Sequence, residues 1–168
     1  MTAISYLERI FETIDEPVGV KDAPDAIPMP EVVGEVKFSH VSFGYEPGQK
    51  ILEDINFTAE PGETYAIVGP TGAGKSTIVN LISRFYNVDS GVITIDGIDI
   101  SKVTLHSLRT QMGIMMQDSF IFAGTIMDNI RYGNRSATDE EVIRAAKTVC
   151  AHDFIMEMEN GYETEVNE

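Results

Sequence analysis

Residues 69–76 read Gly-Pro-Thr-Gly-Ala-Gly-Lys-Ser and complete the pattern G-x-x-x-x-G-K-[ST]. Glycines allow such a loop to wrap so that successive backbone N–H groups point inward at an anion. Loops of this pattern, called P-loops, hold the phosphates of a nucleoside triphosphate, with the lysine on the β- and γ-phosphates and the final hydroxyl on Mg²⁺. We therefore expect Lys75 and Ser76 to take these two roles, aided by the positive end of the helix that begins here.

The residues on both sides of the loop follow the order that its mechanism requires. Before it, residues 64–68 form a short apolar run after the Pro61-Gly62 turn, which is typical of a buried strand. After it, apolar residues recur at helical spacing from Ile78 to Phe85. Strand, glycine loop and helix in this order predict an α/β fold with a P-loop NTPase (RecA-like) core. The predicted cofactor-binding residues of the loop are Gly69, Pro70, Thr71, Gly72, Ala73, Gly74, Lys75, Ser76 and Thr77.

The charge of the chain excludes one class of partner. The 168 residues carry a formal net charge of −15, and nucleic acid binding needs clustered Lys and Arg, so we expect no nucleic acid partner. ATP remains compatible with an acidic chain because the loop, Lys75 and Mg²⁺ supply positive charge locally. No apolar run approaches the ~18 residues that a membrane-spanning helix requires.

The chain divides near residue 30. A helical stripe of apolar residues occupies the first 16 residues, and the segment from Pro17 to Pro30 holds four prolines, which is typical of a linker. The stripe predicts either a helix packed on the domain or the end of a longer preceding helix. We therefore expect a helix and linker over 1–30 and one domain over 31–168.

Apolar patterning predicts further elements within the domain. The expected strands are 34–45, which changes face midway through a bulge, then 51–59, 91–96, 98–100 and 112–116. The expected helices are 105–110, 138–149 with Thr138 as N-cap, and a short one around 153–158. Asp96-Gly97 is a hairpin signal, so we interpret the apolar run before it as part of an antiparallel hairpin rather than a Mg²⁺-binding strand.

Four stretches besides the P-loop carry a family resemblance. They are Val41-Ser-Phe-Gly-Tyr45, the hairpin from Gly91 to Ile100, Leu108-Arg109 with Gly113-Ile-Met-Met-Gln-Asp118, and Phe120 to Ile126 with Asn129-Ile130. From about residue 32 onward the chain resembles the N-terminal part of the nucleotide-binding domain of an ABC transporter of the exporter type. The resemblance implies an incomplete P-loop core, an antiparallel β-subdomain and the start of a helical subdomain.

The resemblance also assigns residues. It implies that Tyr45 stacks on the adenine of ATP and that Gln117, ending the Q-loop strand, binds Mg²⁺ or positions water beside Ser76. The apolar run Phe120–Phe122 would lie near the groove for a transmembrane coupling helix. From the residues alone, Tyr45 is also compatible with a surface hairpin, Gln117 with an exposed strand end, and Phe120–Phe122 with core filling.

The resemblance extends to context. It implies a transporter in which residues 1–30 follow the last transmembrane helix and the domain lies on the cytoplasmic side of the cell membrane. A second nucleotide-binding domain would face this one head to tail, and ATP hydrolysis would drive transport.

The sequence lacks several motifs of the family pattern. It contains no L-S-G-G-Q signature, and neither Asp15-Glu16 nor Asp139-Glu140 follows four apolar residues, as the Walker B strand and its catalytic glutamate would. We therefore expect a fragment that binds ATP but does not efficiently hydrolyse it alone, and that is marginally stable or self-associating because its parallel sheet is incomplete. A non-catalytic ATP-binding or regulatory module is the alternative, and a small P-loop kinase is a third hypothesis.

Overall fold

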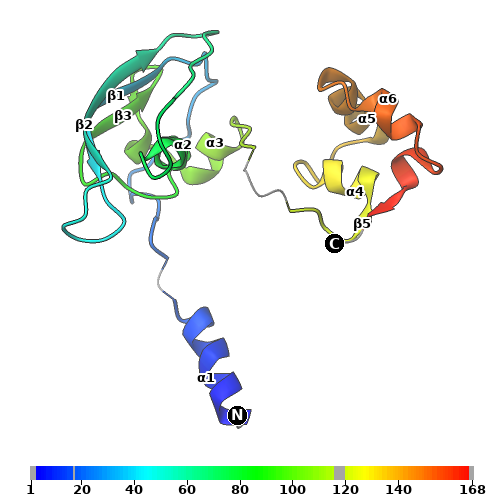
Figure 1. Cartoon of the computed structure of the whole chain (residues 1–168), viewed down its shortest axis with the longest axis horizontal. Helices are drawn as coiled ribbons and strands as arrows, with labels where there is room; N and C mark the ends of the chain where they lie inside the picture. The colour runs from blue at the N-terminus through cyan, green and yellow to red at the C-terminus, as the bar shows by residue number, and fades with distance from the viewer. Residues whose placement is uncertain (1–2, 17, 116–119, 167–168) are drawn as a thin grey trace. The chain divides into compact units, whose positions relative to one another are not determined.

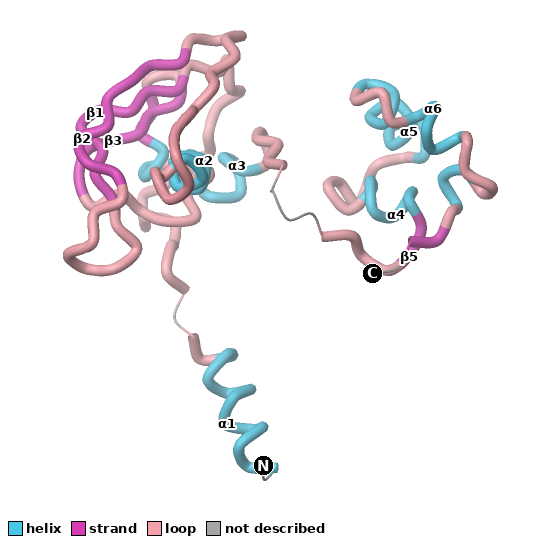
Figure 2. Tube along the Cα trace, in the orientation of Figure 1, coloured by secondary structure: helices cyan, strands magenta, loops and turns pink. Residues whose placement is uncertain are grey.

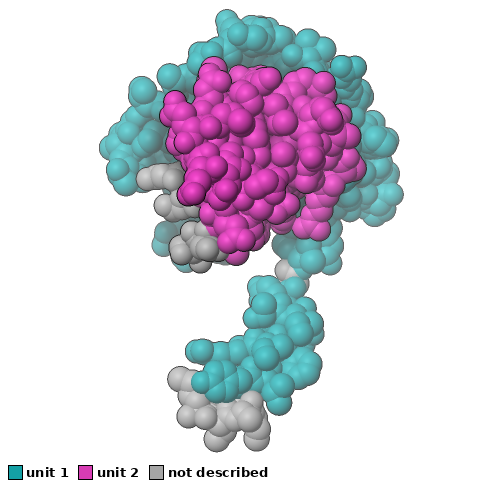
Figure 3. Space-filling view, turned by 90° about the vertical axis from the view of Figure 1, so that its right-hand side faces the viewer, with its two compact units in different colours: residues 1–113 teal, residues 114–168 magenta. Residues whose placement is uncertain are grey.

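The computed structural model describes residues 3–16, 18–115 and 120–166 of the chain. The chain divides into two compact units, Met1–Gly113 and Ile114–Glu168, which Figure 3 distinguishes by colour. Figures 1 and 2 show that the first unit holds the larger sheet, whereas the second is mainly helical.

A four-stranded antiparallel sheet forms the first unit. Its strands lie in the order β2-β1-β3-β4. The strands are β1 (Val36–Phe43), β2 (Leu52–Ala59), β3 (Ser90–Ile95) and β4 (Ile98–Asp99). The predicted antiparallel subdomain is therefore confirmed.

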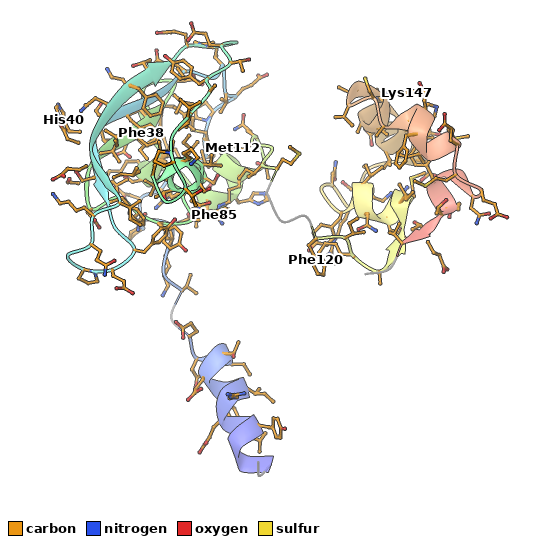
Figure 4. All side chains as sticks on the ribbon, in the orientation of Figure 1. Phe38, His40, Phe85, Met112, Phe120 and Lys147 are labelled. Carbon is orange, nitrogen blue, oxygen red and sulfur yellow. The ribbon has the colours of Figure 1, made fainter. Side chains whose placement is uncertain are left out.

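The predicted change of face in β1 occurs at His40. Its φ of 51° and the register shift between Phe38 and Val41 mark a bulge. Because the bulge inserts one extra residue, Phe38 and Val41 both point into the core, with exposed fractions of 1% and 0%. The His40 side chain points away from the sheet (Figure 4). Gly91 lies in β3 opposite this bulge. Glycine is required there, because a Cβ would lie 2.2 Å from the carbonyl oxygen of His40.

Two helices cover one face of this sheet, α2 (Lys75–Ile82) and α3 (Leu105–Arg109) (Figure 1). The core between these helices and the sheet includes Phe38, Leu81 and Leu108. Apolar burial on the inner face of these helices provides most of the driving force for the packing.

The helix after the P-loop ends earlier than the apolar spacing predicted. α2 stops at Ile82, and Arg84 follows in a left-handed conformation with φ 52°. The buried guanidinium of Arg84 donates hydrogen bonds to the carbonyl oxygens of Ile100 and Val103 at 3.1 and 2.8 Å, which fixes the turn. Phe85 therefore lies beyond the helix rather than on its apolar stripe.

The Asp96-Gly97 turn joins β3 to β4 with φ values of 51° and 76°, as a type I′ hairpin requires. The carboxylate of Asp96 accepts three backbone N–H groups, from Val33, Gly34 and Glu35, at 2.7, 2.9 and 2.8 Å. Asp96 is thus a structural acceptor within a hairpin, consistent with the rejection of a Mg²⁺-binding role.

Two predicted strands do not form. Residues 64–68 and 112–115 are not in strands, and no other described segment pairs with either. A strand is stabilised by a neighbouring ladder. Without one, residues 64–68 and 113–115 stay exposed, whereas Met112 packs partly buried against the core. Val68 is 87% exposed and Met115 is 94% exposed. Met116, the end of the second predicted strand, lies outside the described residues.

The proline-rich segment is held against the α3 region of the first unit at several points. The backbone N–H of Met29 donates to Ser107 Oγ at 2.8 Å, and Gln111 Nε2 donates to the carbonyl oxygen of Pro30 at 2.9 Å. Met29 is buried in the core. In contrast, α1 (Ala3–Ile14) leaves its apolar stripe exposed; the described members are Tyr6, Leu7, Ile10, Phe11 and Ile14.

The second unit is a small helical cluster with a two-stranded ribbon. Its elements are β5 (Gly124–Thr125), α4 (Ile126–Arg131), α5 (Asp139–Thr148), α6 (His152–Met156), η2 (Gly161–Glu163) and β6 (Glu165–Val166). Thr138 caps α5 as predicted, in a capping box with Glu141. Among the described residues of both units, none of the helices has the length and apolarity needed to traverse a bilayer.

Candidate functional site

The loop 69–74 connects the segment 64–68 to α2. Gly72 and Gly74 have φ values of 84° and 83°, conformations that favour glycine. The backbone N–H of Ala73 donates to the carbonyl oxygen of Pro70 at 3.2 Å, closing a tight turn. The loop therefore turns back on itself immediately before the helix begins.

Gly74 also provides close packing between the loop and the sheet. It is the N-cap residue of α2 and is buried, and a Cβ on it would lie 2.7 Å from Leu52 Cδ2 and 3.1 Å from Ile51 Cγ2. The start of β2 therefore supports the start of α2. No side chain caps this helix end, so its first backbone N–H groups are left for an anion.

The ammonium group of Lys75 lies over its own loop. Its Nζ donates hydrogen bonds to the carbonyl oxygens of Gly69 at 2.9 Å and Pro70 at 2.7 Å. An ammonium has three donors, so a ligand oxygen can take the third donor or replace one of the two neutral carbonyl oxygens. The arrangement places a positive charge at the loop, where the phosphates of a nucleotide are expected.

Two hydroxyls follow Lys75 in the first turn of α2, and they have different surroundings. Ser76 is exposed, whereas Thr77 is 5% exposed, with its Oγ1 3.3 Å from the hydroxyl of Tyr45. In the described part of the chain, no three His, Cys, Asp or Glu side chains gather to hold a metal ion. The exposed hydroxyl of Ser76 is accessible to Mg²⁺, which in nucleotide sites is held mainly by phosphate oxygens.

Tyr45 reaches the P-loop helix from the turn after β1. Besides Thr77, its hydroxyl accepts a hydrogen bond from Asn80 Nδ2 at 3.3 Å. The ring stands nearly perpendicular to those of Phe43 and Tyr86, at centroid distances of 5.0 and 4.9 Å. It is still 44% exposed, and an open hollow of about 440 Å³ lies beside it, along the turn 44–50.

The structure thus brings together the loop residues, Lys75, Ser76, Thr77 and Tyr45, all of which the sequence predicted. It adds Asn80 and Tyr86, which the sequence did not predict. The only available signal for Asn80 was its spacing of three residues from Thr77 on one helix. Gln117, predicted to bind Mg²⁺ or water, lies outside the described residues.

In the second unit, the predicted Phe120–Phe122 run forms an exposed aromatic patch. We define this patch as Phe120, Ile121, Phe122 and Tyr132, which are 65%, 50%, 42% and 50% exposed. The rings of Phe120 and Phe122 lie 4.9 Å apart, and that of Tyr132 lies 4.3 Å from Phe122. Figure 4 shows Phe120 at the start of this unit.

Asn129 holds the backbone of the aromatic patch in place. Its side chain accepts the N–H of Phe122 at 2.8 Å and donates to the carbonyl oxygens of Phe122 and Thr125 at 2.9 Å. These bonds fix a loop that would otherwise depend on exposed apolar contacts alone. The patch is therefore an ordered surface, and ordered apolar surfaces of this kind mark interfaces.

Comparison with known proteins gives consistent matches. The family model described as ABC transporter matches residues 52–164. The chain is 50% identical over 161 residues to the ABC transporter ATP-binding protein YknV of Bacillus subtilis, covering 96% of this chain and 27% of that protein. It is 44% identical over 167 residues to the fatty acid ABC transporter ATP-binding/permease protein of Mycobacterium bovis, covering 99% of this chain and 26% of that protein.

A solved structure agrees with these relatives. A bacterial Atm1-family ABC exporter with ATP bound superposes with a TM-score of 0.88 at 44% identity. The match covers 98% of this chain and 29% of that one. The expected fold class is thus confirmed, and the chain spans little more than a quarter of the length of the curated relatives it matches.

Proposed function

Because the chain belongs to the ABC transporter family, we propose that it binds Mg-ATP as the ATP-binding part of an exporter. The observation that carries this proposal is the P-loop, where Lys75 lies at the uncapped start of α2. Tyr45 contacts the same helix through Thr77, which supports a base site next to the phosphate site.

Each group has a distinct part in the proposed complex. The N–H groups of the loop and of the first turn of α2 bind the phosphates, and Lys75 exchanges a carbonyl partner for a phosphate oxygen. Ser76 and Gln117 bind Mg²⁺, which neutralises phosphate charge. The exposed surface of the Tyr45 ring stacks on adenine, a contact worth about 1–3 kcal/mol on the scale of nucleic acid bases.

Transport is proposed for the whole protein and not for this chain alone. The aromatic patch receives a coupling helix from the transmembrane domain, and a second nucleotide-binding domain covers the ATP in a head-to-tail dimer. The whole protein hydrolyses ATP on the cytoplasmic side of the membrane. These 168 residues contain no signature motif and no catalytic glutamate after a Walker B strand, so we expect this chain alone to bind ATP without efficient hydrolysis.

Nucleotide titration of the chain with a fluorescent ATP analogue, with Mg²⁺ and with EDTA, tests the proposed binding. We expect saturable binding that Mg²⁺ strengthens and that unlabelled ATP competes away. Tyr45→Ala should weaken binding about 5- to 100-fold through lost stacking, whereas Tyr45→Phe keeps the ring and most of the affinity. Tyr132→Ala is the matched control, because it removes a tyrosine of similar exposure, 50% against 44% for Tyr45, from the second unit.

Two results would count against the proposal. Absence of competable binding by the wild-type chain would remove the nucleotide site. Phosphate release by the chain at a rate comparable with whole transporters would contradict the expectation of binding without efficient hydrolysis.

Cross-linking in the intact transporter tests the proposed coupling surface. A cysteine replacing Ile121 in the aromatic patch should cross-link to the transmembrane domain. A cysteine replacing Val149, which is 73% exposed at the end of α5, should not. Equal cross-linking from both positions would show that the patch is not the docking surface.

A further inference from the structure

Tyr86 is the remaining member of an aromatic trio at the nucleotide site. Its ring lies 4.9 Å from that of Tyr45 with an interplanar angle of 81°, and 5.6 Å from that of Phe43 with an angle of 51°. Phe43 is 3% exposed and belongs to the core, whereas Tyr86 is 42% exposed. Tyr86 is therefore not part of the buried core, and its aromatic partners are Tyr45 and Phe43.

The turn at the end of α2 explains why Tyr86 is found there. Arg84 adopts a left-handed conformation, and its buried guanidinium is fixed by the carbonyl oxygens of Ile100 and Val103. The two aromatic residues that follow then take different neighbours. Phe85 lies under the guanidinium of Arg109, 5.0 Å from its carbon, while Tyr86 packs on Tyr45.

Tyr45 is thus restrained through both its hydroxyl group and its ring. Thr77 and Asn80 contact its hydroxyl, each at 3.3 Å, and both residues belong to α2. Phe43 and Tyr86 contact its ring. The hydroxyl contacts by themselves leave the ring free to rotate about the axis through its hydroxyl, and the near-perpendicular contact with Tyr86 opposes that rotation.

We propose that Tyr86 is a positioning residue that fixes the ring plane of Tyr45 for the base of the nucleotide. The inference rests on the proposed function, in which Tyr45 stacks on adenine. A stacking partner that is already oriented loses less freedom on binding, so the Tyr86 contact increases the affinity for the base. It does not act on the phosphates, which the P-loop holds.

The difference between base and phosphates gives the test. We compare Mg-ATP with Mg-tripolyphosphate, which carries the phosphate chain without a base, by competition against the fluorescent analogue. Tyr86→Leu should weaken Mg-ATP binding about three- to tenfold, the loss expected for one aromatic pair, and leave tripolyphosphate unchanged. Tyr86→Phe keeps the ring and should retain wild-type affinity for both ligands.

Phe85→Leu is the matched control, because Phe85 is the preceding residue and is 40% exposed, yet it packs on Arg109. It should leave both affinities unchanged. Asn80→Ala provides a second variant should Tyr86→Leu fold poorly by circular dichroism. It removes a donor to the Tyr45 hydroxyl, and we expect a loss for ATP but not for tripolyphosphate.

The outcomes separate this inference from the proposed function. Equal losses for ATP and tripolyphosphate in Tyr86→Leu, or no loss for either, would overturn the positioning role while leaving ATP binding intact. A wild-type chain that binds neither ligand would overturn the proposed function, and the positioning role with it.

Discussion

The ammonium nitrogen of Lys75 lies 2.7 Å from the carbonyl oxygen of Pro70, in the loop that directly precedes the lysine. A second bond to the carbonyl oxygen of Gly69, at 2.9 Å, holds the side chain over the loop. A cation positioned in this way is pre-oriented for phosphate, and it needs only a short movement to exchange a neutral oxygen for a charged one. The two hydrogen bonds that order the Lys75 side chain therefore also place its charge for the proposed phosphate contact.

Lys75→Ala should leave the stability of the nucleotide-free chain nearly unchanged. Its two carbonyl partners belong to exposed residues, so water replaces the ammonium when it is removed. We expect the free energy of unfolding to change by less than about 1 kcal/mol, measured by urea denaturation. A much larger loss of unfolding free energy would show that Lys75 stabilises the fold of the first unit and does not serve ligand binding alone.

Gly74→Ala should destabilise the first unit far more than Gly72→Ala. Both glycines have positive φ, but only at Gly74 would a Cβ collide, 2.7 Å from Leu52 Cδ2. Strain at a left-handed position costs about 1–2 kcal/mol in each variant, and overpacking adds about 1–3 kcal/mol at Gly74. Urea denaturation without nucleotide checks the difference; equal losses would show that Gly74 does not pack closely on β2.

Asp96→Asn should destabilise the chain by about 1–3 kcal/mol, because an amide has one acceptor oxygen for three backbone N–H groups. Partial burial acts to raise the pKa of Asp96, whereas these N–H groups lower it, and the net pKa lies below its usual value. The stabilisation is therefore complete above the unfolded pKa and is lost as pH falls through the lower folded pKa.

Denaturation of wild type and Asp96→Asn as a function of pH checks this account. The difference in the free energy of unfolding between the two proteins should be constant near neutral pH. It should shrink only in acid, below the usual pKa of an aspartate, about 4. Asp99→Asn is the control, since Asp99 accepts one backbone N–H, from Ser101, at 2.8 Å. A difference between wild type and Asp96→Asn that shrinks already above pH 6 would point to another titrating group.

Self-association should follow from the exposed apolar residues of segments 64–68 and 114–115. Met115 is 94% exposed and Val68 is 87% exposed, and neither segment pairs with a described strand. Unpaired apolar segments promote association, and a charge on them opposes it. Sedimentation velocity should show oligomers that increase with concentration, and fewer in Met115→Lys than in Val149→Lys. A wild-type chain that stays monomeric at all concentrations would contradict this.

Features that depend on local chemistry were predicted from the sequence. The P-loop, the Asp96-Gly97 hairpin and the Thr138 cap each follow from a few neighbouring residues. The bulge in β1 was also predicted from the sequence. The apolar residues of this strand occupy even-numbered positions at Val36 and Phe38 but odd-numbered positions at Val41 and Phe43. In each case the residues that decide the conformation are close together in the chain, so their pattern alone was sufficient.

Features that depend on distant partners were not predicted. Residues 64–68 have strand composition but no neighbouring strand among the described residues, so composition alone predicted wrongly. The proline-rich segment has the composition of a linker, yet Ser107 and Gln111 hold it from more than seventy residues away. Tyr86 joined the site only because Arg84 ends α2 early, and the bonds that fix Arg84 are likewise long-range.

Calorimetric titration of Lys75→Ala against Lys147→Ala measures whether this chain binds Mg-ATP through its P-loop. Lys147 is exposed in α5, in the second unit, and lies outside the proposed nucleotide site. We predict that Lys75→Ala weakens Mg-ATP binding about 10- to 100-fold, as expected for the loss of a hydrogen bond to a charged group, while Lys147→Ala binds like wild type. Equal affinity in the two variants would show that the P-loop lysine does not hold the nucleotide.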